Sequence, residues 1–186
     1  MKKIKFGFTL IETIVVVAVI ALTLPVLIGT IFILVREQTK VVRLSQVKRE
    51  GDYLINIIEN TVKNRAVSIH SAKPSDETNL VCNLAGDSFS GPPLYFLDEA
   101  GKWFGYQSGV NTVATASAIS TINLTSNKTI LSNFSISCIR NTIFSPASIL
   151  LDFDICYDTG AGDCVSVRPE EVTTIHYQTR IKLRNY

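Results

Sequence analysis

The sequence predicts an α+β fold, with one long N-terminal helix whose outer half packs on an antiparallel β-sheet. Three observations predict it. An apolar stretch over residues 8–35 is followed by a polar stretch with helically spaced apolar residues. Beyond Pro74 the composition shifts to Ser, Thr, Asn and Gly with short apolar alternations. A chain of 186 residues leaves room for one further domain of roughly 100 to 150 residues.

The first element is the apolar segment 8–35, which contains a single ionisable side chain, Glu12. As a helix it would be about 42 Å long, enough to span a hydrocarbon core of about 30 Å. A cleaved secretory signal has a shorter core, of about 7 to 15 residues. A plain membrane anchor leaves Glu12 unexplained, because a carboxylate deep in the bilayer would cost about 2.5 to 3.5 kcal/mol. Pro25 removes one helical hydrogen bond and predicts a helix break, or local unwinding during assembly.

The start of this segment carries a specific motif. Residues 5–12 read KFGFTLIE, with a basic leader, Gly7, Phe8 and then Glu12. The run resembles the prepilin cleavage and methylation motif of type IV pilin-like proteins. That resemblance implies a pilin-like fold, removal of a leader at 1–7 by cleavage between Gly7 and Phe8, and N-terminal methylation of Phe8. It also implies that Glu12 meets the Phe8 amine of a neighbouring subunit, a pairing that reduces the cost of both charges in hydrocarbon.

The same resemblance implies a structural subunit of a type IV pilus-like filament. The implied partners are prepilin peptidase, other pilin or pseudopilin subunits, an assembly platform in the membrane, and membrane lipid. The chain would be a single-pass protein of the cytoplasmic membrane with its N-terminus inside, and after assembly part of a periplasmic or cell-surface filament. Basic residues on both sides of the segment leave the orientation undecided by charge alone.

Later stretches resemble J-type and W-type minor pseudopilins and minor pilins, and so favour a minor subunit. The stretches are residues 49–54, 124–126, 131–134 and 182–185. Two alternatives stay open: a type II secretion pseudopilin, and a membrane-tethered adhesin or ligand-binding ectodomain. The second would show an exposed pocket or a large apolar patch outside the helix interface.

The second element is an amphipathic continuation of the helix over residues 36–66. Its apolar stripe consists of Leu44, Val47, Leu54, Ile58 and Val62. Gly51 takes one position of the stripe. We expect the helix to reach about Arg65 and to pack on the sheet; a free coiled coil is the alternative, although the stripe is short.

The third element is a β-rich ectodomain over residues 67–186. Residues 94–97 and 102–107 flank the turn 98–101 and predict a hairpin. Alternation predicts a strand from Ile149 to Tyr157 and a last strand over 175–183. Trp103, Phe104 and Tyr106 are expected in the sheet core or in cross-strand pairs, with an aromatic ligand platform as the alternative.

All four cysteines follow the apolar segment, which suits an oxidising compartment. Three connectivities are possible. Cys156 and Cys164 bracket a short glycine-containing loop, which favours a local bridge and leaves Cys82 with Cys138. Four free buried thiols are the alternative.

No pattern typical of an enzyme, a zinc site or a cofactor site occurs around the two histidines, His70 and His176. Asp158 and Asp163 are weak candidates for calcium, together with Asp152 and Asp154, and could equally be hairpin-tip residues.

Charge does not predict binding to nucleic acid. Three of the 18 Lys and Arg residues precede the proposed cut, which leaves 15 against 16 Asp and Glu. We therefore expect no specific nucleic acid, although Arg180, Lys182 and Arg184 could touch phosphates. Asn123, Asn127 and Asn133 lie in glycosylation sequons, relevant if the host modifies them.

Overall fold

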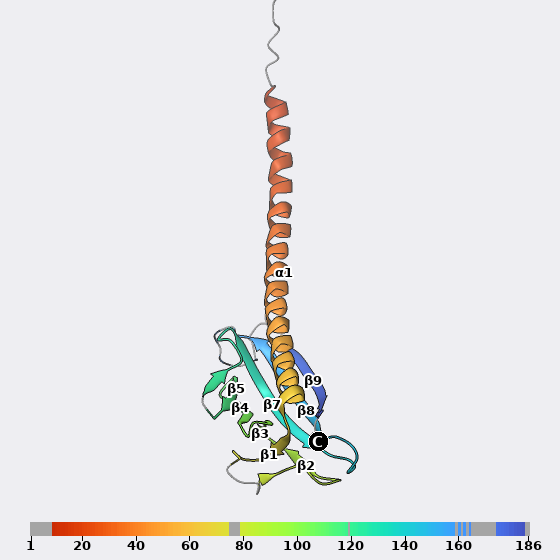
Figure 1. The fold of residues 1–186 in the computed structure, drawn as a ribbon. Coiled ribbons are helices and arrows are strands. Elements are labelled where there is room, and N and C mark those ends of the chain that lie inside the picture. The colour runs from red at the N-terminus through yellow and green to blue at the C-terminus, as the bar shows by residue number, and fades with distance from the viewer. Residues whose placement is uncertain are drawn as a thin grey trace, which may run out of the picture. The chain divides into compact units, whose positions relative to one another are not determined.

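The structure, a computed structural model, describes residues 9–74, 79–118, 120–158, 160, 162, 164 and 174–184. One helix and nine strands follow each other along these residues: α1 (Leu10–Arg65), β1 (Ser68–His70), β2 (Ser88–Ser90), β3 (Leu94–Leu97), β4 (Trp103–Ser108), β5 (Val113–Ser117), β6 (Thr121–Asn123), β7 (Thr129–Ile139), β8 (Ser148–Tyr157) and β9 (Thr174–Lys182). The chain divides into two compact units between Val42 and Arg43, within α1. The fold is α+β, with one long N-terminal helix and antiparallel sheets (Figure 1).

The helix α1 begins with a partial capping box. The Thr9 carbonyl accepts from the backbone N–H groups of Glu12 and Thr13, at 3.1 and 3.2 Å. The Glu12 carboxylate reaches back to the Thr9 N–H at 3.4 Å, which serves a donor that the helix itself cannot pair. At the other end Lys63 and Arg65 lie in the last turn, where positive charge suits the helix dipole.

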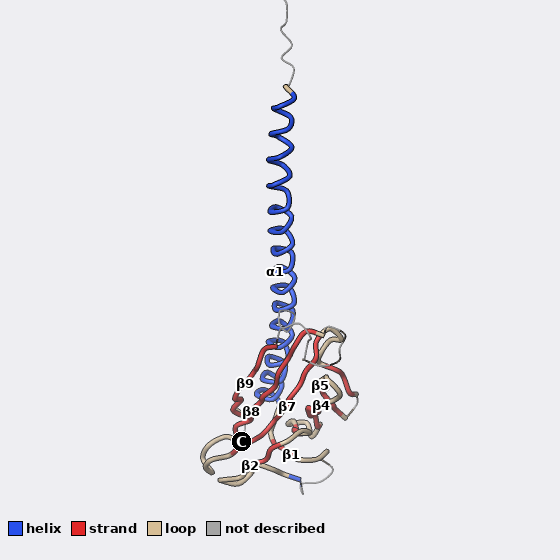
Figure 2. The backbone as a smooth tube through the Cα atoms, turned by 180° about the vertical axis from the view of Figure 1, so that it is seen from behind, coloured by secondary structure: helices blue, strands red, loops and turns tan. Residues whose placement is uncertain are grey.

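The strands form two sheets, and every pairing between them is antiparallel. The five-stranded sheet has the order β1-β3-β4-β5-β6, and the four-stranded sheet has the order β2-β7-β8-β9. The sequence predicted a single sheet. The split arises because β2 pairs with β7 and leaves the neighbouring hairpins to the other sheet. In Figure 2 the long strands β7, β8 and β9 lie side by side.

The second unit is built around a core that residues 43–65 of α1 share with both sheets. The helix contributes Val47, Gly51, Leu54, Ile58 and Val62, all buried. Figures 1 and 2, which show opposite sides, both place this part of α1 against β7, β8 and β9. Leu44 was predicted on the same stripe, but it is 43% exposed because it lies one turn before the packed region.

The predicted hairpin and strand alternations are present. Leu94–Leu97 pairs with Trp103–Ser108, and Phe96 stacks on Phe104 with ring centroids 5.4 Å apart. Trp103 packs edge-on against Tyr95, at 5.7 Å. In β8 the inward residues Ile149, Leu151, Phe153 and Ile155 are fully buried.

Two disulfides hold the second unit. Cys82 is bonded to Cys138, and Cys156 to Cys164. This is the pairing favoured by the spacing of the cysteines, and it excludes the alternative of four free thiols. The first bridge joins residues 56 apart in the sequence and ties the segment before β2 to the end of β7.

Candidate functional site: the apolar helix and its carboxylate

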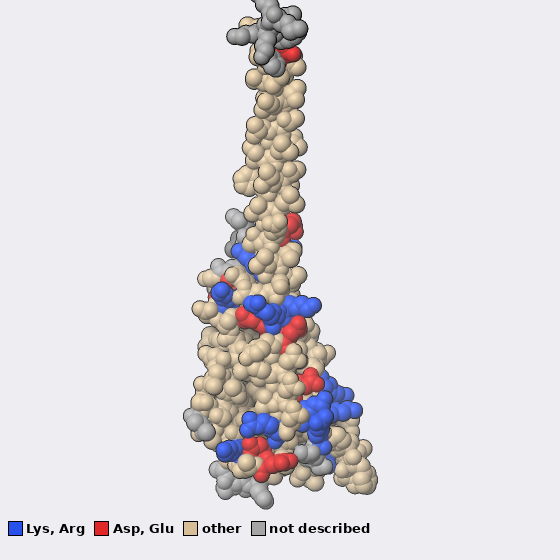
Figure 3. All heavy atoms as spheres, turned by 45° about the horizontal axis from the view of Figure 1, so that its top comes forward, with Lys and Arg blue, Asp and Glu red and all other residues tan. Residues whose placement is uncertain are grey.

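Every described side chain from Leu10 to Val42 is exposed. The segment is long and apolar enough to cross a membrane, which is the requirement for an anchor. Residues 13–35 contain no Lys, Arg, Asp or Glu. On the face drawn in Figure 3 the helix accordingly shows a long uncharged stretch below the acidic atoms at its start. So much exposed apolar surface is unstable in water and must be covered by lipid or protein.

Most polar side chains within the apolar segment are satisfied by the helix itself. The hydroxyls of Thr13, Thr23 and Thr30 each donate to the carbonyl three residues earlier, at 2.8, 3.4 and 2.8 Å. They can therefore enter hydrocarbon at little cost. Glu12 differs, because the contacts that its exposed carboxylate accepts from described residues are long: both come from Thr9, at 3.4 Å from the backbone N–H and from the hydroxyl.

A shallow groove of about 390 Å³ lies on the turns that follow Glu12, on the opposite face of the helix. Its lining residues are Thr13, Ile14, Val17, Ala18 and Ala21. The two alanines leave the backbone accessible, and small residues of this kind let two helices approach closely in a membrane. The carboxylate and the groove are thus close along the helix axis but face different neighbours.

Pro25 does not break the helix in this structure, because α1 is continuous from Leu10 to Arg65. Local unwinding at Pro25 during assembly stays a prediction. Gly7 and Phe8, the residues of the predicted cut, lie outside the described residues.

In the second unit, Gly51 explains how α1 and β9 come together. A Cβ atom on Gly51 would lie 2.2 Å from Cε2 of Tyr177. The Tyr177 hydroxyl lies 3.0 Å from the Lys48 carbonyl oxygen and 3.1 Å from Asp52 Oδ1, two acceptors for its single proton, and its ring stacks on Phe153. Burial, followed by the nearby Asp52 carboxylate, raises the pKa of Tyr177 to about 12, so it stays a neutral donor. The sequence had indicated only a missing apolar residue at this position.

Glu50 forms a second polar contact between the helix and the sheet. Its carboxylate accepts from the Ser126 hydroxyl at 2.6 Å and from the Thr129 hydroxyl at 2.5 Å. Burial alone would raise the pKa of Glu50, but these hydrogen bonds outweigh it and hold the pKa below its usual value. The sequence alone does not indicate a role for Glu50. A single glutamate on a helix matches no motif, and its partners are 76 and 79 residues away.

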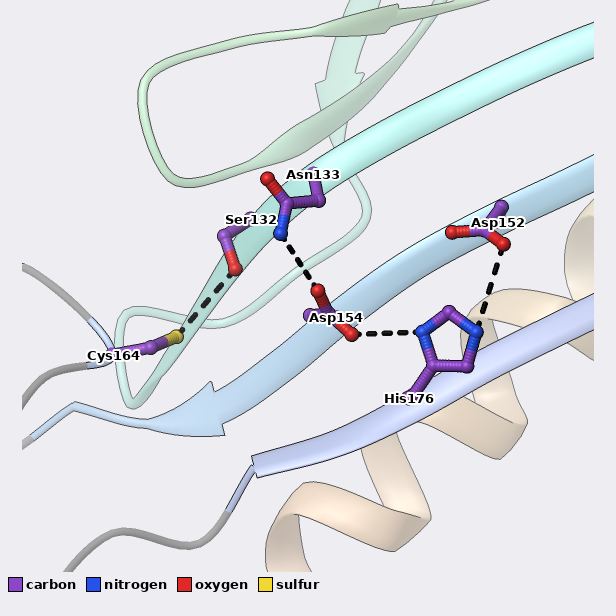
Figure 4. Close-up of polar contacts among 6 residues, drawn as sticks. All are labelled: Ser132, Asn133, Asp152, Asp154, Cys164 and His176. Atoms are coloured by element: carbon purple, nitrogen blue, oxygen red, sulfur yellow. Dashed lines mark hydrogen bonds and ion pairs between the residues drawn. The ribbon is translucent and has the colours of Figure 1, made fainter.

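A polar cluster lies on the solvent side of β7, β8 and β9 (Figure 4). His176 Nδ1 is 2.8 Å from an Asp154 oxygen and Nε2 is 3.6 Å from an Asp152 oxygen, while Asn133 donates to the second Asp154 oxygen at 2.8 Å. The hydrogen bond to Asp154 raises the pKa of His176. The hydrogen bonds from Asn133 and then His176 lower the pKa of Asp154. No carboxylate lies at ligand spacing from either histidine in the sequence, and only the pairing of β8 with β9 brings Asp154 beside His176.

The remaining candidates are not gathered into a site. Asp158 accepts from the Gly160 N–H at 2.7 Å, as a turn residue does, and Asp163 lies outside the described residues. The described part of the chain holds no group of three or more His, Cys, Asp or Glu arranged for a metal ion. Arg180, Lys182 and Arg184 alternate with buried or half-buried residues and point to solvent.

Comparison of the chain with protein-family models, curated proteins and solved structures finds no match.

Proposed function

We propose that this chain is a subunit, of the minor type, of a type IV pilus-like filament. A prepilin peptidase would cut it between Gly7 and Phe8 and methylate the new N-terminus, and the apolar helix would then pass from the membrane into the filament. The disulfide-linked second unit would form the extracytoplasmic part. The observation that carries the proposal is Glu12, the one carboxylate of the exposed apolar segment 8–35, which lies at the start of that segment and five residues after Gly7.

The charge argument gives Glu12 its role. Cleavage before Phe8 creates an ammonium group that is costly in hydrocarbon, and Glu12 is a carboxylate with the same problem. Pairing the two between neighbouring subunits reduces both costs and sets the axial register of the helices. The groove over Thr13 to Ala21 supports the proposal, because it offers a second helix a close-packing face on the side of the helix opposite Glu12.

Glu12 also has a purely local role as part of the capping box, and the two roles can be separated. A glutamine caps nearly as well as a glutamate but carries no charge. If Glu12 pairs with an amine, Glu12→Gln and Glu12→Ala should both be cleaved normally and both be poorly incorporated into filaments. If capping is its only role, Glu12→Gln should be incorporated like the wild type.

The experiment is mass spectrometry of the N-terminus from membranes and from sheared filaments of the same cells. We expect a methylated Phe8 in both fractions for the wild type, and in the membrane fraction alone for the two Glu12 variants. Glu37→Ala is the matched control, since Glu37 is another exposed carboxylate on the same helix, and its incorporation should be normal. An intact Met1 on filament-borne or membrane protein would refute the proposal.

A further inference from the structure

The second unit carries an exposed apolar tip at one end of the four-stranded sheet. The tip consists of Leu84, Ile143 and Phe144, which are 66%, 61% and 93% exposed. Ile143 and Phe144 lie in the connection between β7 and β8, which projects in Figure 1 beside the C-terminal end of the described chain. Large apolar side chains that gather on a surface mark a contact with another protein or with a membrane.

Polar contacts join the two segments that carry the apolar tip. The Arg140 guanidinium donates to the carbonyls of Asn83 and Ile143, at 2.7 and 2.9 Å. The backbone N–H of Leu84 donates to the Asp87 carboxylate at 3.0 Å, so this acidic group is engaged inside its own segment. The tip is therefore presented as one ordered surface, which loses little conformational entropy on binding.

A row of basic side chains follows β9 to the same end of the second unit. The basic row consists of Arg180 and Lys182 on the strand and Arg184 just beyond it, all exposed. Alternate residues of a strand point to one side and lie about 7 Å apart. Among the described residues none of the three forms an ion pair. Alone such a row is a solvated edge strand, and beside an apolar surface it becomes half of a mixed contact.

The strand register places the basic row beside the apolar tip. Lys182 pairs with Ser148, the first residue of β8, and the N–H of the residue after Lys182 donates to the Ala147 carbonyl at 3.2 Å. Ala147 follows Phe144 by three residues in the same connection. Ile139 of β7 also pairs with Ser148, so its exposed side chain shares a face with Lys182. Basic and apolar side chains thus lie side by side.

This surface lies away from the point where α1 enters the second unit. The Arg43 guanidinium lies over the Tyr157 ring, 5.2 Å from its centroid, at the last residue of β8. The apolar tip instead precedes the first residue of that strand, and ten residues of strand span about 30 Å. A partner can therefore reach the tip without touching the entry point of the helix.

We propose that the apolar tip and the basic row bind the surface of an anionic lipid bilayer. The tip enters the boundary between headgroups and acyl chains, and the basic row lies against the headgroup phosphates. A bilayer suits a projecting tip because it needs no pocket of matching shape. Nucleic acid suits it less, because Leu84 and Ile143 offer no ring on which a base can stack. The contact goes beyond the proposed function and needs neither cleavage at Phe8 nor a filament.

The test uses the full chain, held by its apolar helix in nanodiscs of phosphatidylcholine. The nanodiscs are mixed with vesicles of phosphatidylcholine alone or of equal parts phosphatidylcholine and phosphatidylglycerol, and bound protein is measured by flotation. We expect flotation with the anionic vesicles only. Phe144→Ser should weaken the binding at least about tenfold, because a large apolar side chain no longer leaves water. Lys182→Gln combined with Arg184→Gln should weaken it about 25-fold, roughly fivefold for each charge.

The matched controls change an exposed apolar residue and an exposed basic residue elsewhere on the second unit. Val110→Ser and Lys128→Gln should bind the anionic vesicles like the wild type. All variants should also melt like the wild type, followed by Trp103 fluorescence, because the changed side chains are exposed. Loss of binding with an unchanged melting temperature separates a contact role from a folding role.

Three results would overturn lipid binding: no flotation, equal flotation with neutral vesicles, or wild-type binding by Phe144→Ser. A single-stranded oligonucleotide that binds the wild type and Phe144→Ser equally, and displaces both from the vesicles, would assign the basic row to nucleic acid instead. Failure of flotation leaves the proposed function standing, because the nanodisc experiment requires no processing. An intact Met1 in cells would in turn refute the proposed function and leave lipid binding standing.

Discussion

Gly51→Ala adds one methyl group to α1 where the Tyr177 ring touches the helix backbone. In an ordinary helix interior this change stabilises by about 1 kcal/mol, because glycine is a poor helix former. Here the new Cβ would lie 2.2 Å from the ring, so the ring must move. Overpacking of this kind costs about 1 to 3 kcal/mol. Displacement of the ring also weakens its hydrogen bonds to Lys48 and Asp52, at about 1 kcal/mol.

We therefore expect Gly51→Ala to lower the free energy of unfolding by about 1 to 3 kcal/mol, equivalent to about 2 to 12 °C in melting temperature. The sign should reverse when the ring is absent. In a Tyr177→Ala background the same change should stabilise by about 1 kcal/mol, since only the helix propensity remains. The expected coupling energy between the two sites is thus about 2 to 4 kcal/mol.

The assay is thermal unfolding of the full chain in detergent micelles with its disulfides intact. Fluorescence of Trp103, the one tryptophan in the sequence, reports on the second unit. All four members of the cycle are compared at one pH and one detergent concentration. Stabilisation by Gly51→Ala in the wild-type background, or an effect of equal sign and size in both backgrounds, would show that the ring does not constrain this position.

Three further predictions concern the second unit. Glu50→Ala should destabilise by about 1 to 3 kcal/mol in thermal unfolding at pH 7, and the difference from wild type should shrink as pH falls below about 4.5, because the folded-state pKa of Glu50 is lowered. The pKa of His176 is raised in the folded chain, so its contribution to stability is full below about pH 6.5 and is lost as pH rises through the folded-state pKa. His176→Gln should therefore lower the melting temperature less at pH 9 than at pH 5.5, and an equal deficit at both pH values would contradict this. Replacing Cys82 and Cys138 by serine should lower the free energy of unfolding by about 4 kcal/mol, and replacing Cys156 and Cys164 by about 2.5 kcal/mol. The difference arises because the two bridges close loops of 56 and 8 residues, and chemical unfolding of the two variants measures it.

The features that the sequence predicted well are those with a local period. The buried stripe Val47, Leu54, Ile58 and Val62 follows the 3.6-residue repeat, and the inward residues of β8 follow the two-residue repeat. The local bridge at Cys156 follows from a short loop. In each case the information needed lies within a few neighbouring residues.

The features that it missed depend on register between distant segments. Gly51 looks like a gap in a stripe until β9 brings Tyr177 against it, and His176 gains Asp154 only through the pairing of β8 with β9. The division into two sheets likewise depends on which strand β2 joins. The Phe8 cut and the pairing of Glu12 with a neighbouring amine rest on the motif and on charge, and the experiments above test them.

The notch at Gly51 has a consequence for how the chain matures. The helix is made first, whereas the tyrosine that fills its notch lies on β9, the last strand of the described chain. A partly synthesised chain therefore presents an unfilled helix surface at Gly51 until β9 has been made. Truncation before residue 174 would leave this surface open, so the exposed notch would distinguish a chain without β9 from one that contains it.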